Sequence, residues 1–172
     1  KDGPYPQDAV YYTYANTDFS DVEIIPKRLF EYPYPTIDTD IVLDEAGVYH
    51  LFFNTWGGTD GLLRRQYVFT DLHDQDKWRL VEGRMQPNDI ASEGSCAYPL
   101  AGGEWILVYD CFRDGFSQFC RSKDLIQFEL VRTTSMDEGA FSPRHGTVIQ
   151  ITEKEFEILK KKIQVTDTNR KR

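Results

Sequence analysis

The sequence predicts an all-β fold, a partial β-propeller of about three blades that is followed by one short C-terminal α-helix. Two sets of recurring motifs and the strand-like segments between them lead to this fold class. The first motif recurs with its aspartates 53 residues apart both times, at Asp18, Asp71 and Asp124. The second recurs at 55 and 52 residues and is centred on Asp38, Glu93 and His145. A fixed period above about 20 residues is typical of propellers, solenoids and arrays.

The segments between the motifs have the composition of buried strands, because they are rich in β-branched and aromatic residues and are bounded by glycine-containing turns. Four short antiparallel strands in about 50 residues match the size of one propeller blade. The chain is therefore expected to contain two full blades and parts of two more. Strands are predicted at residues 10–15, 47–53, 63–69, 104–109, 117–121 and 147–151.

One helix is predicted after the strands. Thr152 and Glu155 have the spacing of a capping box, and Phe156, Leu159 and Ile163 follow at helical spacing. The propeller domain is expected to span residues 1–165, with a disordered polar tail at 166–172.

Composition limits the classes of partner. The 172 residues are 40% hydrophobic and 14% aromatic, which is enough for a sizeable core, and the formal net charge is −8. A negatively charged chain is not attracted to phosphate backbones or anionic lipids, so neither nucleic acid nor a membrane is expected as a partner. A neutral ligand is favoured.

The three cysteines, Cys96, Cys111 and Cys120, have no CxxC spacing. They indicate neither a disulfide framework nor a zinc site, and buried apolar thiols are the favoured interpretation. No cofactor and no metal ligands are predicted, although a metal ion in the channel near His145 stays open.

Chemistry is expected where the innermost strands of successive blades converge on the propeller axis. Equivalent positions there are predicted to hold Asp38, Glu93 and His145. Two carboxylates across a small channel raise each other's pKa, so that one can stay protonated and act as a general acid. Glycoside hydrolysis requires such a pair. His145 could orient a water, bind sugar or tune Glu93.

Structural roles are the alternative for each of these residues. Asp38 or Asp40 could form an Asx-turn, Glu93 could pair with an arginine, and His145 could be a structural histidine. Most aromatic residues are expected in the core. Trp56, in a glycine-rich loop, is the favoured candidate for stacking on a sugar.

The segments 37–42, 92–95 and 144–149 occur in an order that resembles glycoside hydrolase family 43, the five-bladed propeller arabinosidases and xylosidases. The resemblance covers roughly residues 10–160 and suggests the C-terminal portion of such a domain. One departure is Ser95, where the family commonly has proline after the Glu-Gly pair.

The resemblance implies a role for each matching residue. Glu93 resembles the proton donor, and Asp38 resembles the carboxylate that raises the pKa of the acid and orients it. His145 resembles the channel histidine, and Asp40 and Arg144 are expected to contact substrate. The implied reaction is hydrolysis of arabinosides or xylosides of plant-type polysaccharides with inversion.

The general base lies in the first blade of that family, and this chain is expected to begin late in the second. The base is therefore expected to be absent, since Asp2 and Asp8 lie among Pro, Gly and Gln. The leading hypothesis is a glycosidase that needs further blades for activity, and homo-oligomers or association with those blades are expected. A non-catalytic carbohydrate-binding propeller and a protein-interaction scaffold are the alternatives. The substrate class slightly favours a secreted or periplasmic location.

Overall fold

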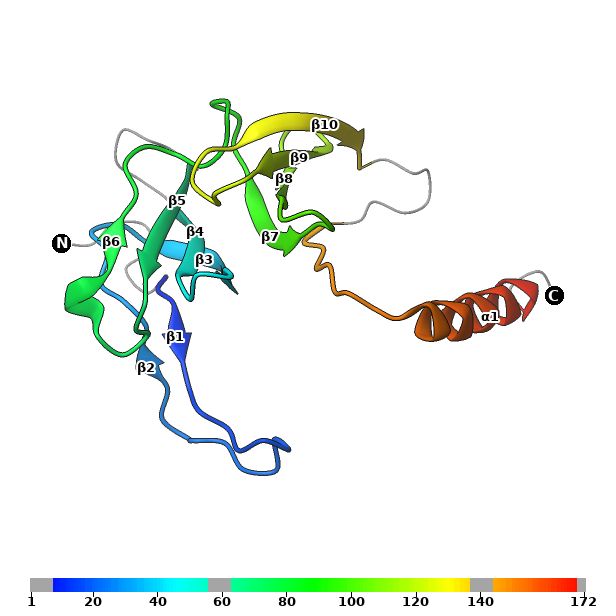
Figure 1. Ribbon diagram of the computed structural model, residues 1–172, viewed down its shortest axis with the longest axis horizontal. Helices are drawn as coiled ribbons and strands as arrows, with labels where there is room; N and C mark the ends of the chain where they lie inside the picture. The colour runs from blue at the N-terminus through cyan, green and yellow to red at the C-terminus, as the bar shows by residue number, and fades with distance from the viewer. Residues whose placement is uncertain (1–7, 56–62, 137–143, 170–172) are drawn as a thin grey trace.

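The computed structural model describes residues 8–55, 63–136 and 144–169. Strands dominate it, as the repeating pattern predicts, and the elements follow one another along the chain (Figure 1). They are β1 (Tyr11–Tyr12), β2 (Lys27–Arg28), β3 (Thr36–Leu43), β4 (Tyr49–Thr55), β5 (Leu63–Phe69), the short 3₁₀ helix η1 (Gln75–Lys77), β6 (Arg79–Leu80), β7 (Glu93–Pro99), β8 (Trp105–Cys111), β9 (Phe116–Ser122), β10 (Glu129–Ser135) and α1 (Glu153–Asn169).

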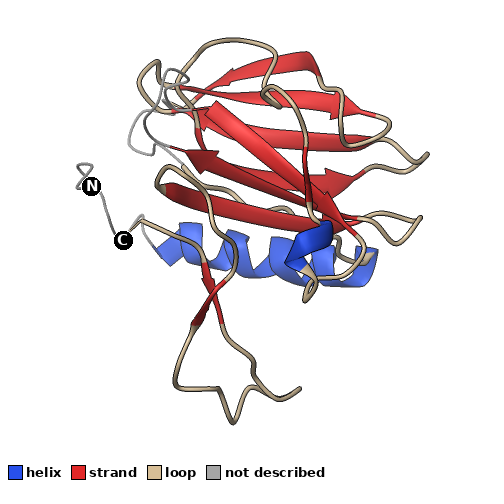
Figure 2. Ribbon diagram, turned by 90° about the vertical axis from the view of Figure 1, so that its left-hand side faces the viewer, coloured by secondary structure: helices blue, strands red, loops and turns tan. Residues whose placement is uncertain are grey.

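The strands form two four-stranded antiparallel sheets and one two-stranded ribbon. The first sheet has the order β3-β4-β5-β6, and the second contains β7, β8, β9 and β10 side by side in chain order. Each sheet is a meander in which every strand pairs with the next, which is the structure of a propeller blade. The ribbon of β1 and β2 precedes them and protrudes from the sheets in Figure 2.

The core lies on both faces of β4, because successive side chains of a strand point to opposite faces. Phe52 belongs to a cluster that reaches into the second sheet, where Leu107 and Tyr109 lie. Its neighbours Leu51 and Phe53 belong to a second cluster on the other face of the first sheet. All five of these side chains have no exposed surface, so the two sheets are packed as neighbouring blades. The cysteines are free and buried, as predicted.

The first repeated motif is a set of Asx-turns. The carboxylates of Asp18, Asp71 and Asp124 each accept a hydrogen bond from the backbone N–H two residues later, at 3.1, 2.9 and 2.9 Å. Phe19 and Leu125, which follow two of these aspartates, both have a φ of 57°. Aspartate favours such turns because its carboxylate accepts the backbone N–H that would otherwise need a backbone carbonyl. The recurring aspartates therefore build turns of the blades.

The strand predicted at residues 147–151 is wrong. These residues form exposed coil beyond the second sheet, and Val148 contacts Cys96 through a single N–H···S hydrogen bond of 3.4 Å. A β-branched sequence becomes a strand only where its backbone pairs with a neighbouring strand. Residues 148–150 share a cleft with Tyr98 and Pro99 of the edge strand β7, but the described residues form no ladder between the two segments. The strand predicted at 10–15 is shorter, Tyr11–Tyr12, and a lone bridge joins Ala15 to Val22.

The C-terminal helix begins with the predicted capping box. Thr152 N–H donates to Glu155 Oε2 at 2.8 Å, and Glu155 N–H donates back to Thr152 Oγ1 at 3.3 Å. The helix continues through Asn169, past the boundary predicted after Val165, because residues 153–169 contain no Gly or Pro to end it. The helices of the described chain include none that is both long and apolar enough to cross a bilayer.

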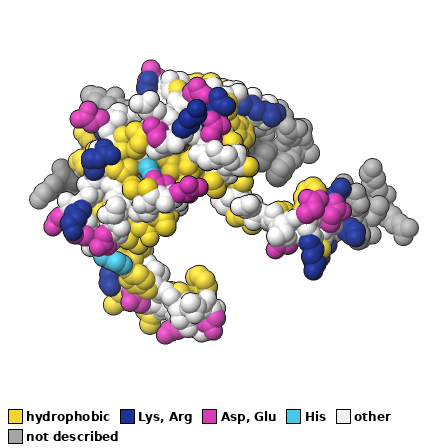
Figure 3. All heavy atoms as spheres, viewed as in Figure 1, with side chains coloured by type: hydrophobic (Ala, Val, Ile, Leu, Met, Phe, Trp, Pro, Cys, Tyr) yellow, Lys and Arg dark blue, Asp and Glu magenta, His cyan; other side chains and the backbone are white. Residues whose placement is uncertain are grey.

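Apolar side chains also reach the surface in the loop between β1 and β2. Ile24 is 95% exposed, and Ile25 and Phe19 are each 78% exposed. This hairpin forms the lower arm in Figure 3, where several of its side chains are coloured as hydrophobic. Large apolar side chains of this kind are typical of surfaces that contact another protein, and association of the chain stays a prediction.

Candidate active site

Two β-bulges shape the start of the innermost strands. The register of β3 against β4 shifts between Ile37 and Asp40, and the register of β7 against β8 shifts between Glu93 and Cys96. Inside the bulges, Asp38 has a φ of 52° and Gly94 a φ of 57°. Bulges interrupt the ladder and re-aim side chains, often next to active sites.

The bulges change which residues of the two blades are equivalent. Ile37 pairs with Asn54, and Glu93 pairs with Asp110, so Glu93 corresponds to Ile37. Asp38 then corresponds to Gly94. The prediction that Asp38 and Glu93 occupy equivalent positions is therefore wrong by one residue. A one-residue shift sends a strand side chain to the other face, and here the bulges bring the two acidic residues to one region.

A hydrogen bond connects Asp38 to the residue after Glu93. Asp38 Oδ2 accepts the N–H of Gly94 at 3.0 Å. Beside this contact lies a small cleft of about 190 Å³. Its lining residues come from β3, β7 and the coil before the helix: Asp38, Thr39, Gly94, Ser95, His145, Gly146 and Thr147.

His145 lies in coil and not on an innermost strand, which corrects the prediction, yet it reaches the same cleft. Its backbone has a φ of 53°, and its N–H donates to Asp110 Oδ2 at 2.7 Å. The ring lies against Gly94 so closely that a Cβ there would be 2.7 Å from Nδ1. Glycine at position 94 is therefore required by both the contact and the positive φ.

Two side chains lie against the Glu93 carboxylate. The Glu93 side chain is 13% exposed, forms an ion pair with Arg144 and lies close to His145, at 3.4 Å from Oε1 to Nε2. The Arg144 guanidinium lies 5.6 Å from the ring centre of Phe112, a cation–π contact. The Arg144 guanidinium therefore lies between the Glu93 carboxylate and the Phe112 ring.

Two other predicted residues lie outside this arrangement. The carboxylate of Asp40 accepts the N–H of Ala97 at 2.5 Å and thereby fastens β3 to β7. Trp56 lies outside the described residues. The structure thus brings Asp38, Glu93 and the Arg144–His145 pair together. It gives Asp40 a position between the blades.

Sequence reasoning missed Asn54 and Asp110. Asp110 is 4% exposed and binds His145, while the fully buried amide of Asn54 donates from Nδ2 to the carbonyl of Ser92. Both residues join β4 or β8 to the segment that follows in the next blade. They lie 56 residues apart, one after each predicted strand at 47–53 and 104–109. Extending the repeat by one residue would have found them.

Residues 8–55, 63–136 and 144–169 contain no group of three His, Cys, Asp or Glu side chains placed to hold a metal ion. The chemistry that the arrangement itself offers is acid–base, through Glu93 and His145, beside a second carboxylate, Asp38.

A family model described as "Probable glycosyl hydrolase domain", related to glycoside hydrolase family 43, matches residues 2–157. The chain belongs to this family. No curated protein matches it. The fold prediction is confirmed for this glycosyl hydrolase domain: it is mostly β, with antiparallel sheets, a C-terminal helix and a partial match to propeller glycosidases.

Solved structures resemble the glycosyl hydrolase domain over part of their length. A protein from Bacteroides thetaiotaomicron described as a glycosidase has a TM-score of 0.54 and 15% identity, over 83% of this chain and 45% of that one. A thermostable family-43 glycoside hydrolase has a TM-score of 0.52 and 18% identity, over 81% and 56%. At these identities the similarity shows the fold alone. The chain spans about half the length of these structures.

Proposed function

We propose that the chain forms part of a glycoside hydrolase active site that cleaves arabinosides or xylosides of plant-type polysaccharides by inversion, with Glu93 as the general acid. The observation that carries the proposal is the Glu93 side chain. It is only 13% exposed, and side chains hold it at the edge of the bulged strands. A general acid must be within reach of the leaving oxygen and must be able to exchange a proton. The side chains of Arg144 and His145 can move, so that Glu93 can meet both requirements.

Asp38 is proposed to orient the acid and tune it. Its carboxylate accepts the N–H of Gly94, so it fixes the backbone next to Glu93. A second negative charge near the acid favours the protonated form of that acid. His145 is proposed to bind substrate or to hold Glu93 in place, because its ring contacts both the acid and the cleft.

The general base is left unassigned. An inverting enzyme places its base about 6.5 to 9.5 Å from the acid, so that a water fits between them. The carboxylates of Asp38, Asp40 and Asp110 all accept backbone N–H groups, which suits them less well to activate a water. Since the chain spans about half of the structures that it resembles, we propose that efficient turnover requires more of the propeller.

A non-catalytic carbohydrate-binding propeller is the second candidate. The Arg144–Glu93 ion pair favours it, because an arginine that stays in place occupies the side chain that would have to reach the leaving oxygen. In this candidate the same polar groups only hydrogen-bond a sugar.

Glu93→Gln separates the two candidates. The probes are arabino- and xylo-oligosaccharides, with hydrolysis followed by chromatography and binding by calorimetry. Under the first candidate the chain shows slow hydrolysis that falls by about 10²-fold or more in Glu93→Gln. The matched control is Glu82→Gln, an exposed carboxylate between β6 and β7, which should behave like the unmodified chain.

Hydrolysis that survives Glu93→Gln would contradict the assignment of the acid. Binding without hydrolysis in the unmodified chain and both variants, and also in a longer protein that contains the chain, would favour the binding propeller. Arg144→Gln gives a further test. If Glu93 is the general acid, loss of the guanidinium should move the alkaline limb of the pH–activity profile to higher pH, because the carboxyl then keeps its proton to a higher pH.

A further inference from the structure

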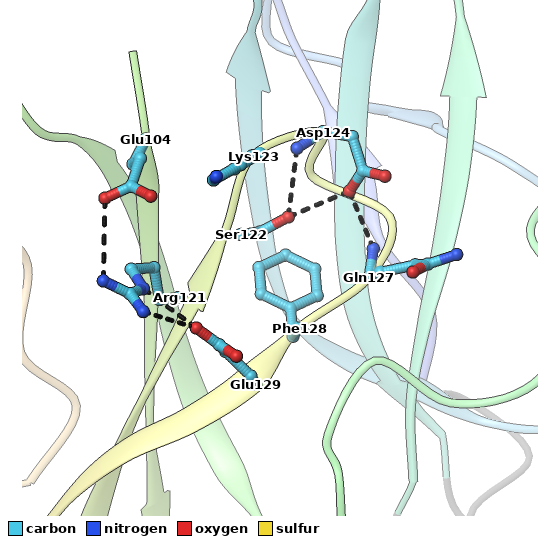
Figure 4. A pocket seen from close by; sticks show the side chains of 8 residues that line it. All are labelled: Glu104, Arg121, Ser122, Lys123, Asp124, Gln127, Phe128 and Glu129. Carbon is cyan, nitrogen blue, oxygen red and sulfur yellow. Dashed lines mark hydrogen bonds and ion pairs between the residues drawn. The ribbon is translucent and has the colours of Figure 1, made fainter. Parts of the chain in front are cut away.

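A second depression lies at the end of the second blade away from Glu93. It has a volume of about 600 Å³ and is formed by the start of β8, the end of β9, the β9–β10 turn and the start of β10 (Figure 4). Glu93 pairs with Asp110 at one end of the blade, and Trp105 pairs with Ser122 at the other. Seven-residue strands are roughly 20 Å long, so this depression is separate from the candidate active site. Its volume is typical of ligand sites.

The floor of the depression is an aromatic ring that cannot turn freely. Phe128 packs against the core, and its ring meets that of Phe52 edge-on, at 5.9 Å between centres and an interplanar angle of 76°. Figure 4 shows Phe128 lying between the Ser122–Asp124 turn and the Arg121–Glu129 pair. A fixed, half-buried ring offers apolar surface with no loss of side-chain freedom on binding.

Planar polar groups surround the ring, and their positions are fixed by contacts within the blade. Glu129 Oε1 accepts hydrogen bonds from Arg121 Nε at 3.0 Å and from Nη2 at 2.6 Å. Glu104 approaches the same guanidinium at 3.8 Å. These contacts leave Arg121 half-exposed and raise its pKa, chiefly through the Glu129 hydrogen bond. Guanidinium and carboxylate groups have the geometry to bind neighbouring hydroxyls in pairs.

Asp124 is the second preorganised group. Its Oδ1 accepts the Ser122 hydroxyl at 3.0 Å and the N–H groups of Ile126 and Gln127, both at 2.9 Å. Burial raises the pKa of Asp124, but these hydrogen bonds outweigh it and hold the pKa below its ordinary value. The carboxylate is therefore an ionised acceptor in a fixed orientation.

An adjoining cleft of about 360 Å³ extends this surface toward the first blade. Lys123 and Asp124 line both depressions, and Trp105 lines the cleft. Phe128 therefore lies in the large depression and Trp105 in the adjoining cleft, and the turn at Lys123 and Asp124 borders both. Such a row suits an extended ligand with repeated apolar faces.

We propose that the two depressions form a saccharide-binding groove, in which Phe128 and Trp105 contact sugar rings and Asp124 and Arg121 bind hydroxyls. The large depression carries carboxylates at Glu104, Asp124 and Glu129 against cations at Arg121 and Lys123, so it is nearly balanced in charge. A neutral polyhydroxyl ligand fits this balance better than an anion. The choice of a pentose oligosaccharide rests on the proposed function, whereas the location of the groove does not.

The test is two-dimensional NMR of the 172-residue chain titrated with xylohexaose and, separately, with arabinohexaose. Backbone amide signals of residues 122–129 should shift in a saturable manner with at least one of the two. Phe128→Leu keeps most of the packing volume and removes the aromatic face, and Arg121→Ala removes an exposed group. Each should weaken the affinity at these signals about tenfold, while the spectrum elsewhere confirms the fold.

Glu93→Gln is the control that separates the two proposals, because it should leave binding at residues 122–129 unchanged. If hydrolysis fails but these signals still shift, only the proposed function fails. The groove proposal is overturned if neither sugar moves these signals at millimolar concentration, or if both groove variants bind as the unmodified chain does. It is also overturned if sodium sulfate moves the same signals in place of the sugars, since the site would then bind anions.

Discussion

Gly94→Ala should disrupt the candidate site more than any other glycine substitution in the described chain. The added Cβ would lie 2.7 Å from Nδ1, 2.8 Å from Cγ and 3.1 Å from Cα of His145. The Cα is backbone and cannot rotate away, so the coil that carries His145 must shift. Position 94 also has a φ of +57°, which costs a residue with a Cβ about 1 to 2 kcal/mol.

The two costs can be separated with a matched control. Gly103 has a φ of +82° and nothing within 4 Å of an added Cβ, so Gly103→Ala carries the backbone cost alone. Gly94→Ala adds overpacking, which is worth about 1 to 3 kcal/mol. With an m-value of about 2 kcal/mol per M, the urea midpoint of Gly94→Ala should lie about 0.5 to 1.5 M below that of Gly103→Ala.

The assay is urea unfolding followed by circular dichroism, together with the imidazole signals of His145 in the NMR spectrum. Those signals should move in Gly94→Ala and stay in place in Gly103→Ala. Equal midpoints for the two variants, with an unchanged His145 signal, would refute the close packing of His145 on Gly94 and the site geometry that depends on it.

Three further outcomes are expected. Burial raises the pKa of Asp44, but the hydrogen bonds from the Val48 N–H and His50 outweigh burial and hold this pKa below 3.8. The ionised Asp44 carboxylate therefore stabilises the fold fully above pH 3.8, and this stabilisation is lost as the pH falls below that value. Asp44→Asn should flatten the acid limb of a stability–pH profile. Asn54→Ala should lower the free energy of urea unfolding by about 1 to 3 kcal/mol, because it leaves a buried carbonyl without its donor. Burial raises the pKa of the Cys120 thiol, so a colorimetric thiol reagent should label it slowly at pH 8 and rapidly in urea; rapid labelling of the native chain would contradict its burial.

Most strands could be predicted because their composition and the repeat agree. The strand predicted at 63–69 is observed as Leu63–Phe69, and the strand predicted at 104–109 is observed as Trp105–Cys111. Glycine turns and β-branched runs suffice for such elements. The segment at 147–151 has the same composition and still forms coil, since strand formation depends on backbone pairing that composition does not reveal.

The site was predicted as a set of residues but not in its geometry. The repeat indicates that Asp38, Glu93 and His145 converge, and contacts link all three through Gly94. The bulges cannot be predicted from the alternation of side chains, because an extra residue changes the register without changing the composition. Asp38 and His145 also adopt positive φ although neither is glycine. The surrounding contacts impose that conformation, which the sequence does not reveal.

The hydrogen-bond partners of the acidic residues distinguish structural carboxylates from the candidate acid. Asp38, Asp40 and Asp110 each accept a backbone N–H from the next segment, those of Gly94, Ala97 and His145. A carboxylate bound in this way is fixed in position, because the backbone donor cannot turn to another acceptor. Glu93 is instead held by the side chains of Arg144 and His145, which can move as a substrate enters. Among these four carboxylates, Glu93 is therefore the one whose partners are side chains, so they can move without breaking a backbone contact between segments.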